Sequence, residues 1–147
     1  MELRSVEELM DLLHAARGAR TGGDPVDLHD HALQTAALLR RGHPSDKELQ
    51  VAGLVHEIGL LLAPGDRAGH AARAADAVRP LLGERVARLV RLQPRDRGDG
   101  RVSDDVLTLR QASEAGRSGG MDAGVMEDWR TLLELIAAHN SRLGAVD

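Results

Sequence analysis

Residues 54–59, Leu-Val-His-Glu-Ile-Gly, place an imidazole and a carboxylate side by side inside an apolar stretch. Reactive polar groups are seldom buried in this way without a partner or a function. The pair is His56 and Glu57, and six further histidines are spread along the chain. Imidazole and carboxylate together bind zinc, iron, manganese or nickel, so these residue types predict a metal centre without choosing the ion.

Three histidines fall on faces of expected helices that a compact bundle would bring together: His31, His56 and His70. His29 and His31 are two positions apart, so on a helix we expect at most one of them to face the core, and the apolar neighbours of His31 favour His31. A lone core histidine is best explained by a hydrogen bond. Three on successive helices beside Glu57 favour metal binding instead. Two others are expected in solvent: His14 and His43.

Composition and periodicity predict the helices that must position these residues. Leu- and Ala-rich segments with a single Trp, and no Tyr or Phe, favour helix over strand. Caps, Gly/Pro breaks and apolar faces define the expected helices: Ser5 to near Gly18, near Asp27 to Gly42, 47–62 capped by Ser45 with Glu48, 70–82, 84–93, 106–115, and a last helix capped by Asp122 that contains Trp129. We therefore predict one all-α domain over residues 1–147, a bundle of six or seven helices around the most apolar one, 47–62.

Charge and composition exclude several classes of function. The formal net charge is −4, and basic residues are mixed with acidic ones, so no footprint for nucleic acid or an acidic membrane is expected. The absence of cysteine excludes disulfides, thiolate metal sites and cysteine nucleophiles. Without a signal-like or membrane-spanning segment, the expected location is the cytoplasm.

Four segments follow one another in the order and spacing of a known family: DPVDLHDHALQTAALL, VAGLVHEIGLLL, GDRAGHAARAADAVRPLLGERVARLVRLQ and LTLRQASEAGRSGGMDAGVMEDWRTLLELIAAHN. Together they resemble the HD-domain superfamily, helical metalloproteins named for a His-Asp pair on the central helix. Within it, the chain is most similar to the compact oxygenase-like branch of the HD-domain phosphonate oxygenases and, more distantly, myo-inositol oxygenase. The resemblance covers most of the chain.

The resemblance implies a set of site residues. His31 corresponds to the first metal-binding histidine, His56 and Glu57 to the His-Asp pair, and His70 to the first of two downstream histidines. Asp24 takes the place of an acid that gates substrate or metal. In the family, the aspartate of the pair bridges two metals, and Glu57 can bridge as well in a slightly larger cavity.

Three departures from the family pattern alter the expected site. Gln93 stands in place of the second downstream histidine, and Arg97 in place of a lysine that binds substrate phosphate. Either His139 or Asn140 takes the position of the closing aspartate. Because an amide oxygen is a poor substitute for imidazole, the second metal position is the more damaged. We expect the protein to bind one divalent ion rather than two, with iron as the preferred ion, or to bind no ion at all. The expected substrate site is formed by Asp24, Gln93, Arg97 and Asn140.

Three functions remain open at this stage. The first is an enzyme, either an oxygenase of small phosphonate or polyol substrates or a single-metal phosphohydrolase in which the ion activates water. Arg97 would then bind the anionic group of the substrate. The second is a degenerate, non-catalytic HD domain that binds a small ligand or a partner. The third is a scaffold whose histidines only form hydrogen bonds. Family membership alone would not supply the substrate.

Overall fold

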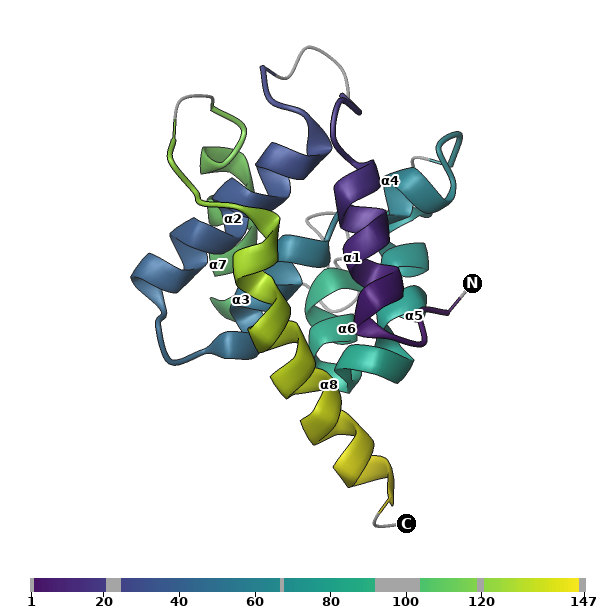
Figure 1. Cartoon of the computed structure of the whole chain (residues 1–147). Coiled ribbons are helices and arrows are strands. Elements are labelled where there is room, and N and C mark those ends of the chain that lie inside the picture. The colour runs from purple at the N-terminus through teal and green to yellow at the C-terminus, as the bar shows by residue number, and fades with distance from the viewer. Residues whose placement is uncertain (1, 21–24, 67, 92–103, 119–120, 146–147) are drawn as a thin grey trace.

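This computed structural model describes residues 2–20, 25–66, 68–91, 104–118 and 121–145. Within these ranges, all the regular secondary structure is helical (Figure 1). Seven of the α-helices have eight or more residues, which confirms the predicted all-α bundle of six or seven helices within these ranges. The elements are α1 Val6–Ala15, α2 Leu28–Gly42, α3 Lys47–Val55, α4 Gly59–Leu62, α5 His70–Leu82, α6 Glu84–Arg91, α7 Asp104–Ala115, the 3-10 helix η1 Met126–Trp129, and α8 Arg130–Ala145.

The first two helices begin where their capping residues predict. The Ser5 hydroxyl accepts a hydrogen bond from the Glu8 N–H at 3.1 Å, and the Asp27 carboxylate accepts one from the Asp30 N–H at 2.8 Å. Such side chains satisfy N–H groups that have no partner within the first helical turn. The second helix also ends at Gly42, as expected.

The expected helix over 47–62 is broken into two, which corrects the sequence prediction. The first part, α3, ends at Val55, and α4 begins only at Gly59. His56 and Glu57 therefore lie in the turn between α3 and α4 rather than on a continuous helix. The break lets the chain turn so that α4 packs against α5.

Two predicted caps are also wrong. Asp46, not Ser45, caps α3, because its carboxylate accepts the hydrogen bond from the Leu49 N–H at 3.1 Å. Asp122 bonds to the nearby N–H of Gly124 at 3.2 Å instead of capping the last helix, which follows η1. Ser45 and Asp46 are adjacent and both are common N-cap residues, so the sequence alone does not choose between them.

Helices α5, α6 and α7 agree closely with the predicted ranges where these are described, whereas Trp129, expected in the last helix, lies in η1 before α8. The fifth and sixth helices, α5 and α6, are separated at Gly83, which has a positive φ of 98° that favours glycine. The next helix, α7, begins at Asp104, two residues earlier than expected. Residues 92 and 93 of the expected helix over 84–93 lie outside the described residues.

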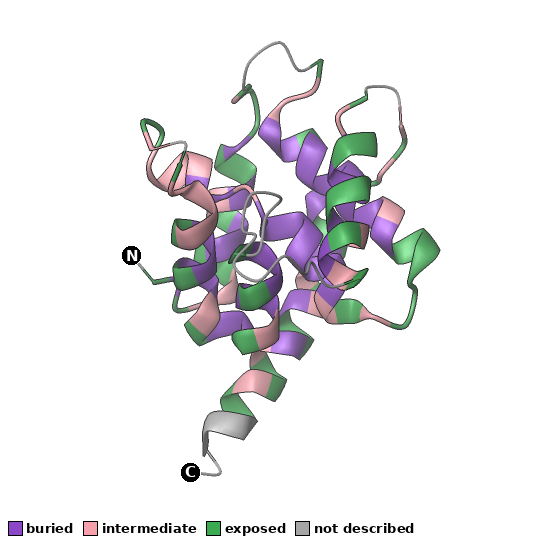
Figure 2. Ribbon diagram, turned by 180° about the vertical axis from the view of Figure 1, so that it is seen from behind, coloured by how far each residue is buried: buried purple, intermediate pink, exposed green. Residues whose placement is uncertain are grey.

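The third helix, α3, is the central one. Every residue from Leu49 to Val55 is buried, and α3 contacts α2, α6, α7 and α8. Figure 2 shows that the buried residues of the surrounding helices lie on the faces turned inward. Trp129 fills one side of the core, and the guanidinium of Arg40 lies 4.8 Å from its ring centroid. None of the helices in the described ranges combines the length and apolar character needed to span a bilayer.

Gly59→Ala should destabilise the fold, because a Cβ at this position would overlap the backbone carbonyl of His70 at the start of α5. The overlap can be relieved only by moving backbone atoms of both segments. We therefore expect the free energy of unfolding to fall by about 1–3 kcal/mol, or the melting temperature by roughly 3–10 °C. Gly42→Ala is the matched control, since a Cβ there meets nothing within 4 Å. Thermal unfolding followed by circular dichroism checks this, and equal melting temperatures for the two variants would contradict it.

Candidate metal centre

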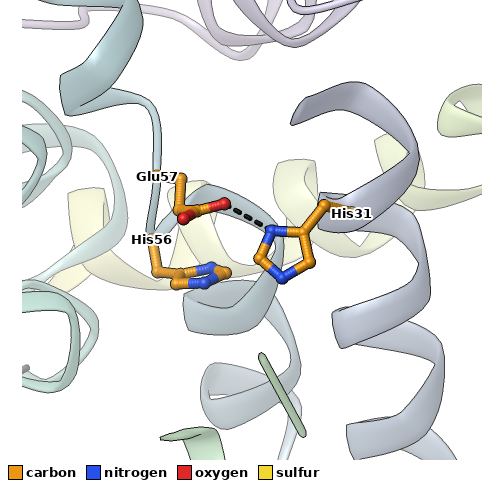
Figure 3. Close-up of side chains that lie close together, drawn as sticks. All are labelled: His31, His56 and Glu57. Atoms are coloured by element: carbon orange, nitrogen blue, oxygen red, sulfur yellow. Dashed lines mark hydrogen bonds and ion pairs between the residues drawn. The ribbon is translucent and has the colours of Figure 1, made fainter. Parts of the chain in front are cut away.

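Three of the predicted ligands converge in the core. His31 comes from α2, and His56 and Glu57 come from the turn after α3 (Figure 3). One candidate ligand atom from each residue lies within 4.8 Å of those from the other two. The two imidazole rings meet edge to face with 5.4 Å between their centroids. The predicted convergence of these three residues is therefore confirmed.

His31 is held as an imidazolium by two acceptors. Its Nδ1 pairs with a carboxylate oxygen of Glu57, and its Nε2 lies 2.8 Å from the backbone carbonyl oxygen of Ser113. Because neither oxygen can donate, both ring nitrogens carry a proton. Burial, the largest influence, lowers the pKa of His31, but the hydrogen bond and the negative charge of Glu57 together raise it above its ordinary value.

The Glu57 carboxylate is ionised although it is largely buried. Burial is again the largest single influence and raises its pKa, but the hydrogen bond from His31 and the surrounding positive charge lower the pKa to about 2. Part of that charge comes from Arg117, whose guanidinium lies 3.6 Å from the second carboxylate oxygen. Glu57 is thus available as an anionic ligand throughout the neutral pH range.

His56 is neutral, and its partners determine its tautomer. Its Nδ1 lies 2.6 Å from the backbone carbonyl oxygen of Gly53, so Nδ1 carries the proton. Its Nε2 therefore accepts a hydrogen bond from the hydroxyl of Ser113, 3.0 Å away. Complete burial of the ring lowers the pKa of His56 below its ordinary value.

Both histidines share an arrangement that is typical of metal ligands. Each donates one ring N–H to a backbone carbonyl, His31 to Ser113 and His56 to Gly53. In metal sites such a bond orients the ring and leaves the opposite nitrogen for the ion. Here the opposite nitrogens are Nδ1 of His31 and Nε2 of His56. Two oriented imidazoles beside one ionised carboxylate form a donor set that fits a divalent ion.

Ser113 joins the two histidines and was missed by the sequence analysis. It lies near the end of α7, is 8% exposed, and contacts His31 through its carbonyl and His56 through its hydroxyl. The available signal was its register: Val106, Leu109 and Ser113 are spaced i, i+3 and i+7, which places the serine on the buried face of α7. A polar residue on such a face needs a polar partner.

The structure does not bring the other predicted ligands into this group. His70 begins α5 and its backbone packs against Gly59, but its ring does not join the three; among the described residues its buried Nδ1 has no hydrogen-bond partner. His139 is exposed on α8, and the Asn140 side chain donates to the carbonyl of Pro80 at 2.9 Å. Asn140 thus packs against the end of α5, and His139 is not part of the buried group, while the C-terminal end of α8 extends away from the body (Figure 1). Three predicted substrate residues lie outside the described residues: Asp24, Gln93 and Arg97.

The expectation that at most one of His29 and His31 faces the core is wrong, since they are only 4% and 2% exposed. α1 packs on the side of α2 that carries His29, where the His14 ring lies 6.3 Å away, centroid to centroid. His29 also forms a second group of candidate ligands with Asp27 and Asp30. Both Asp27 carboxylate oxygens already accept backbone N–H groups, one from Asp30 in the first turn of α2 and one from Gly18 after α1, so structural hydrogen bonds account for this group.

An apolar pocket reaches the centre at Glu57. It has room for about one water molecule and lies among α1, α2, α3 and α4. Its walls are seven apolar side chains and one carboxylate: Leu13, Ala16, Leu28, Ala32, Leu54, Ile58, Leu61 and Glu57. Of the three residues of the centre, Glu57 is the one that lines this pocket.

Comparison with known proteins assigns no family. No family model matches the chain, and no curated protein matches it. The function must therefore be inferred from the residues of the centre themselves.

Proposed function

We propose that this chain is a metal-dependent enzyme of the HD-domain kind that binds one divalent ion, iron(II) first, and uses it in oxygen chemistry on a small molecule. The observation that carries the proposal is the pair of buried imidazoles, each oriented by a backbone carbonyl, beside the ionised carboxylate of Glu57. Two histidines and one carboxylate with open positions form the ligand set of non-haem iron(II) oxygenases. The resemblance to the oxygenase-like HD-domain branch supports the same chemistry.

Each residue then has a defined role. His31 would bind through Nδ1, His56 through Nε2 and Glu57 through a carboxylate oxygen. Bound iron(II) supplies the redox centre for reaction with dioxygen. His31 must release its Nδ1 proton when the ion replaces it, because that nitrogen now donates to Glu57. Arg117, whose guanidinium lies beside the Glu57 carboxylate, would attract the anionic group of a small substrate.

The donor count supports one ion rather than two. The group of candidate ligands at this centre comprises three described residues, and His70, His139 and Asn140 are not among them. Three protein ligands and an open position are sufficient for one catalytic ion, whereas a second ion would need its own set.

Metal binding provides the test. Protein purified without chelator should contain about one divalent ion per chain, and added iron(II), manganese(II) or zinc(II) should raise the melting temperature, because an ion that binds only the folded state stabilises it. His56→Ala should abolish the rise. His139→Ala, which removes an exposed histidine outside the centre, should retain it. Equal rises in the wild type and His56→Ala would contradict the proposal, and two ions per chain would contradict a single-ion centre.

Two alternatives have support as well. Both nitrogens of each ring are already hydrogen-bonded within the protein, which favours a degenerate HD domain that binds a small ligand or partner without a metal. A wild type that responds to none of the three ions would favour this alternative. The same three ligands also suit a single-metal phosphohydrolase with an ion-activated water. Zinc or manganese in the purified protein, in place of iron, would favour it.

A further inference from the structure

The Ser113 hydroxyl occupies an unusual place at the candidate centre. It lies 3.0 Å from Nε2 of His56 and 3.4 Å from Nε2 of His31. The proton positions are determined by the partners: Gly53 accepts from Nδ1 of His56, so Nε2 of this ring has a lone pair and the serine must donate to it. Ser113 thus uses the one nitrogen of His56 that is available to an ion.

We propose that the Ser113 hydroxyl donates its hydrogen bond to Nε2 of His56 only in the metal-free protein, and that it leaves this nitrogen when the ion binds there. This inference rests on the proposed function, because it needs an ion at the centre. A ring nitrogen has a single lone pair, so the hydroxyl and the ion cannot both use it. The hydrogen bond stabilises the metal-free fold, since it satisfies a buried acceptor, and opposes metal binding to the same extent.

The two polar groups of Ser113 have separate functions in this scheme. Its carbonyl accepts from Nε2 of His31, a bond that does not compete with an ion at Nδ1 and therefore persists in both states. Its hydroxyl donates to Nε2 of His56 and has a longer contact, 3.4 Å, with Nε2 of His31; it must rotate away from His56 when the ion binds. Ser113→Ala removes the hydroxyl, retains the carbonyl, and substitutes a residue of high helix propensity within α7. The variant therefore removes the competing bond and retains the backbone-carbonyl partner of each ring.

Ser113→Ala should bind zinc(II) roughly three- to ten-fold more tightly than the wild type, while its metal-free form melts at a lower temperature. A merely structural serine would lower stability without tightening zinc binding. Thr35→Val is the matched control: Thr35 is also buried, and its hydroxyl donates to the backbone carbonyl of His31 at 2.8 Å rather than to a ring nitrogen. It should lower the melting temperature and leave the zinc affinity within two-fold of the wild type.

Zinc titration by calorimetry and thermal unfolding of the metal-free proteins measure both effects. If Ser113→Ala binds zinc equally or more weakly, the hydroxyl does not compete and the inference is overturned, while the metal centre stands. If the wild type binds no zinc, the proposed metal centre is contradicted, and the inference that rests on it is overturned as well. Should Ser113→Ala not fold, nitrogen-15 NMR of the wild-type histidines decides: saturating zinc must move the Nε2 resonance of His56, and an unmoved resonance overturns the inference.

Discussion

Glu57→Gln should weaken zinc binding by about a hundred-fold or more. Glutamine keeps the size and shape of the side chain but replaces the anionic oxygen with a neutral amide, which is a poor ligand for a divalent ion. Loss of a group that only orients a ligand already costs about ten- to a hundred-fold in metal affinity, so loss of a direct ligand should cost no less. Glu57 is also the one carboxylate in the buried group of three.

Glu114→Gln is the matched control for this change. Glu114 also lies near Arg117, with 3.9 Å between the charged atoms, but its side chain is 81% exposed and lies outside the buried group. The variant removes the same formal charge from the neighbourhood of the same arginine. Calorimetric titration with zinc(II) should give the wild-type affinity for Glu114→Gln. A similar affinity for Glu57→Gln would show that the carboxylate does not bind the ion.

Most of the fold could be predicted because the helices are marked by local features. The caps at Ser5 and Asp27 and the breaks at Gly42 and Gly83 act within a few residues of themselves, so the sequence alone contains the information. The apolar character of the segment from Leu49 to Val55 likewise predicted its central position, because an all-round apolar helix must be buried on all sides.

The break in the central helix could not be predicted in the same way. Nothing in the local sequence interrupts the helical pattern between Val55 and Gly59. The turn there depends on a contact with the start of α5, where Gly59 packs against the backbone of His70. A long-range contact of this kind has no local signature other than the glycine itself, and glycine also occurs within helices.

The centre was predicted in part for a related reason. His31, His56 and Glu57 are unusual residue types for apolar helix faces, so their positions suggested burial and convergence. The register of Ser113 on α7 indicates burial, but its contacts with the two histidines follow only from the packing of α7 against α2 and α3. His139 and Asn140 were favoured by the family pattern, but His139 is exposed on α8 and the Asn140 side chain bonds to the backbone of Pro80 in α5.

The free energy of unfolding of the metal-free protein, compared between the wild type and Glu57→Gln, should differ most between about pH 4.5 and 6.5. The folded pKa of Glu57, about 2, lies below its ordinary value of 4.5, so its stabilising effect is complete above pH 4.5 and is lost as the pH falls toward 2. The pKa of His31 is raised above its ordinary value of 6.5, so its effect is complete below pH 6.5 and is lost as the pH rises through the raised pKa. Both pKa shifts arise from the same ion pair, so its contribution to the free energy of unfolding is counted once. At the plateau the pair contributes on the order of 3 kcal/mol.

Urea unfolding of the two proteins from pH 3 to pH 9 in the presence of a chelator measures this difference. Comparison with Glu57→Gln is needed because burial also lowers the pKa of His56, and this alone reduces stability as the pH falls below 6.5. The effect of burial is common to both proteins and cancels in the difference, whereas the Glu57 charge, which raises the pKa of His56, is present only in the wild type and adds to the difference in the same direction. The difference should therefore fall on the acidic side as Glu57 is protonated, and on the basic side as His31 loses its proton. A difference that stays constant across the whole range would mean that His31 and Glu57 do not form an ion pair in the metal-free protein, and that the centre is held by neutral hydrogen bonds instead.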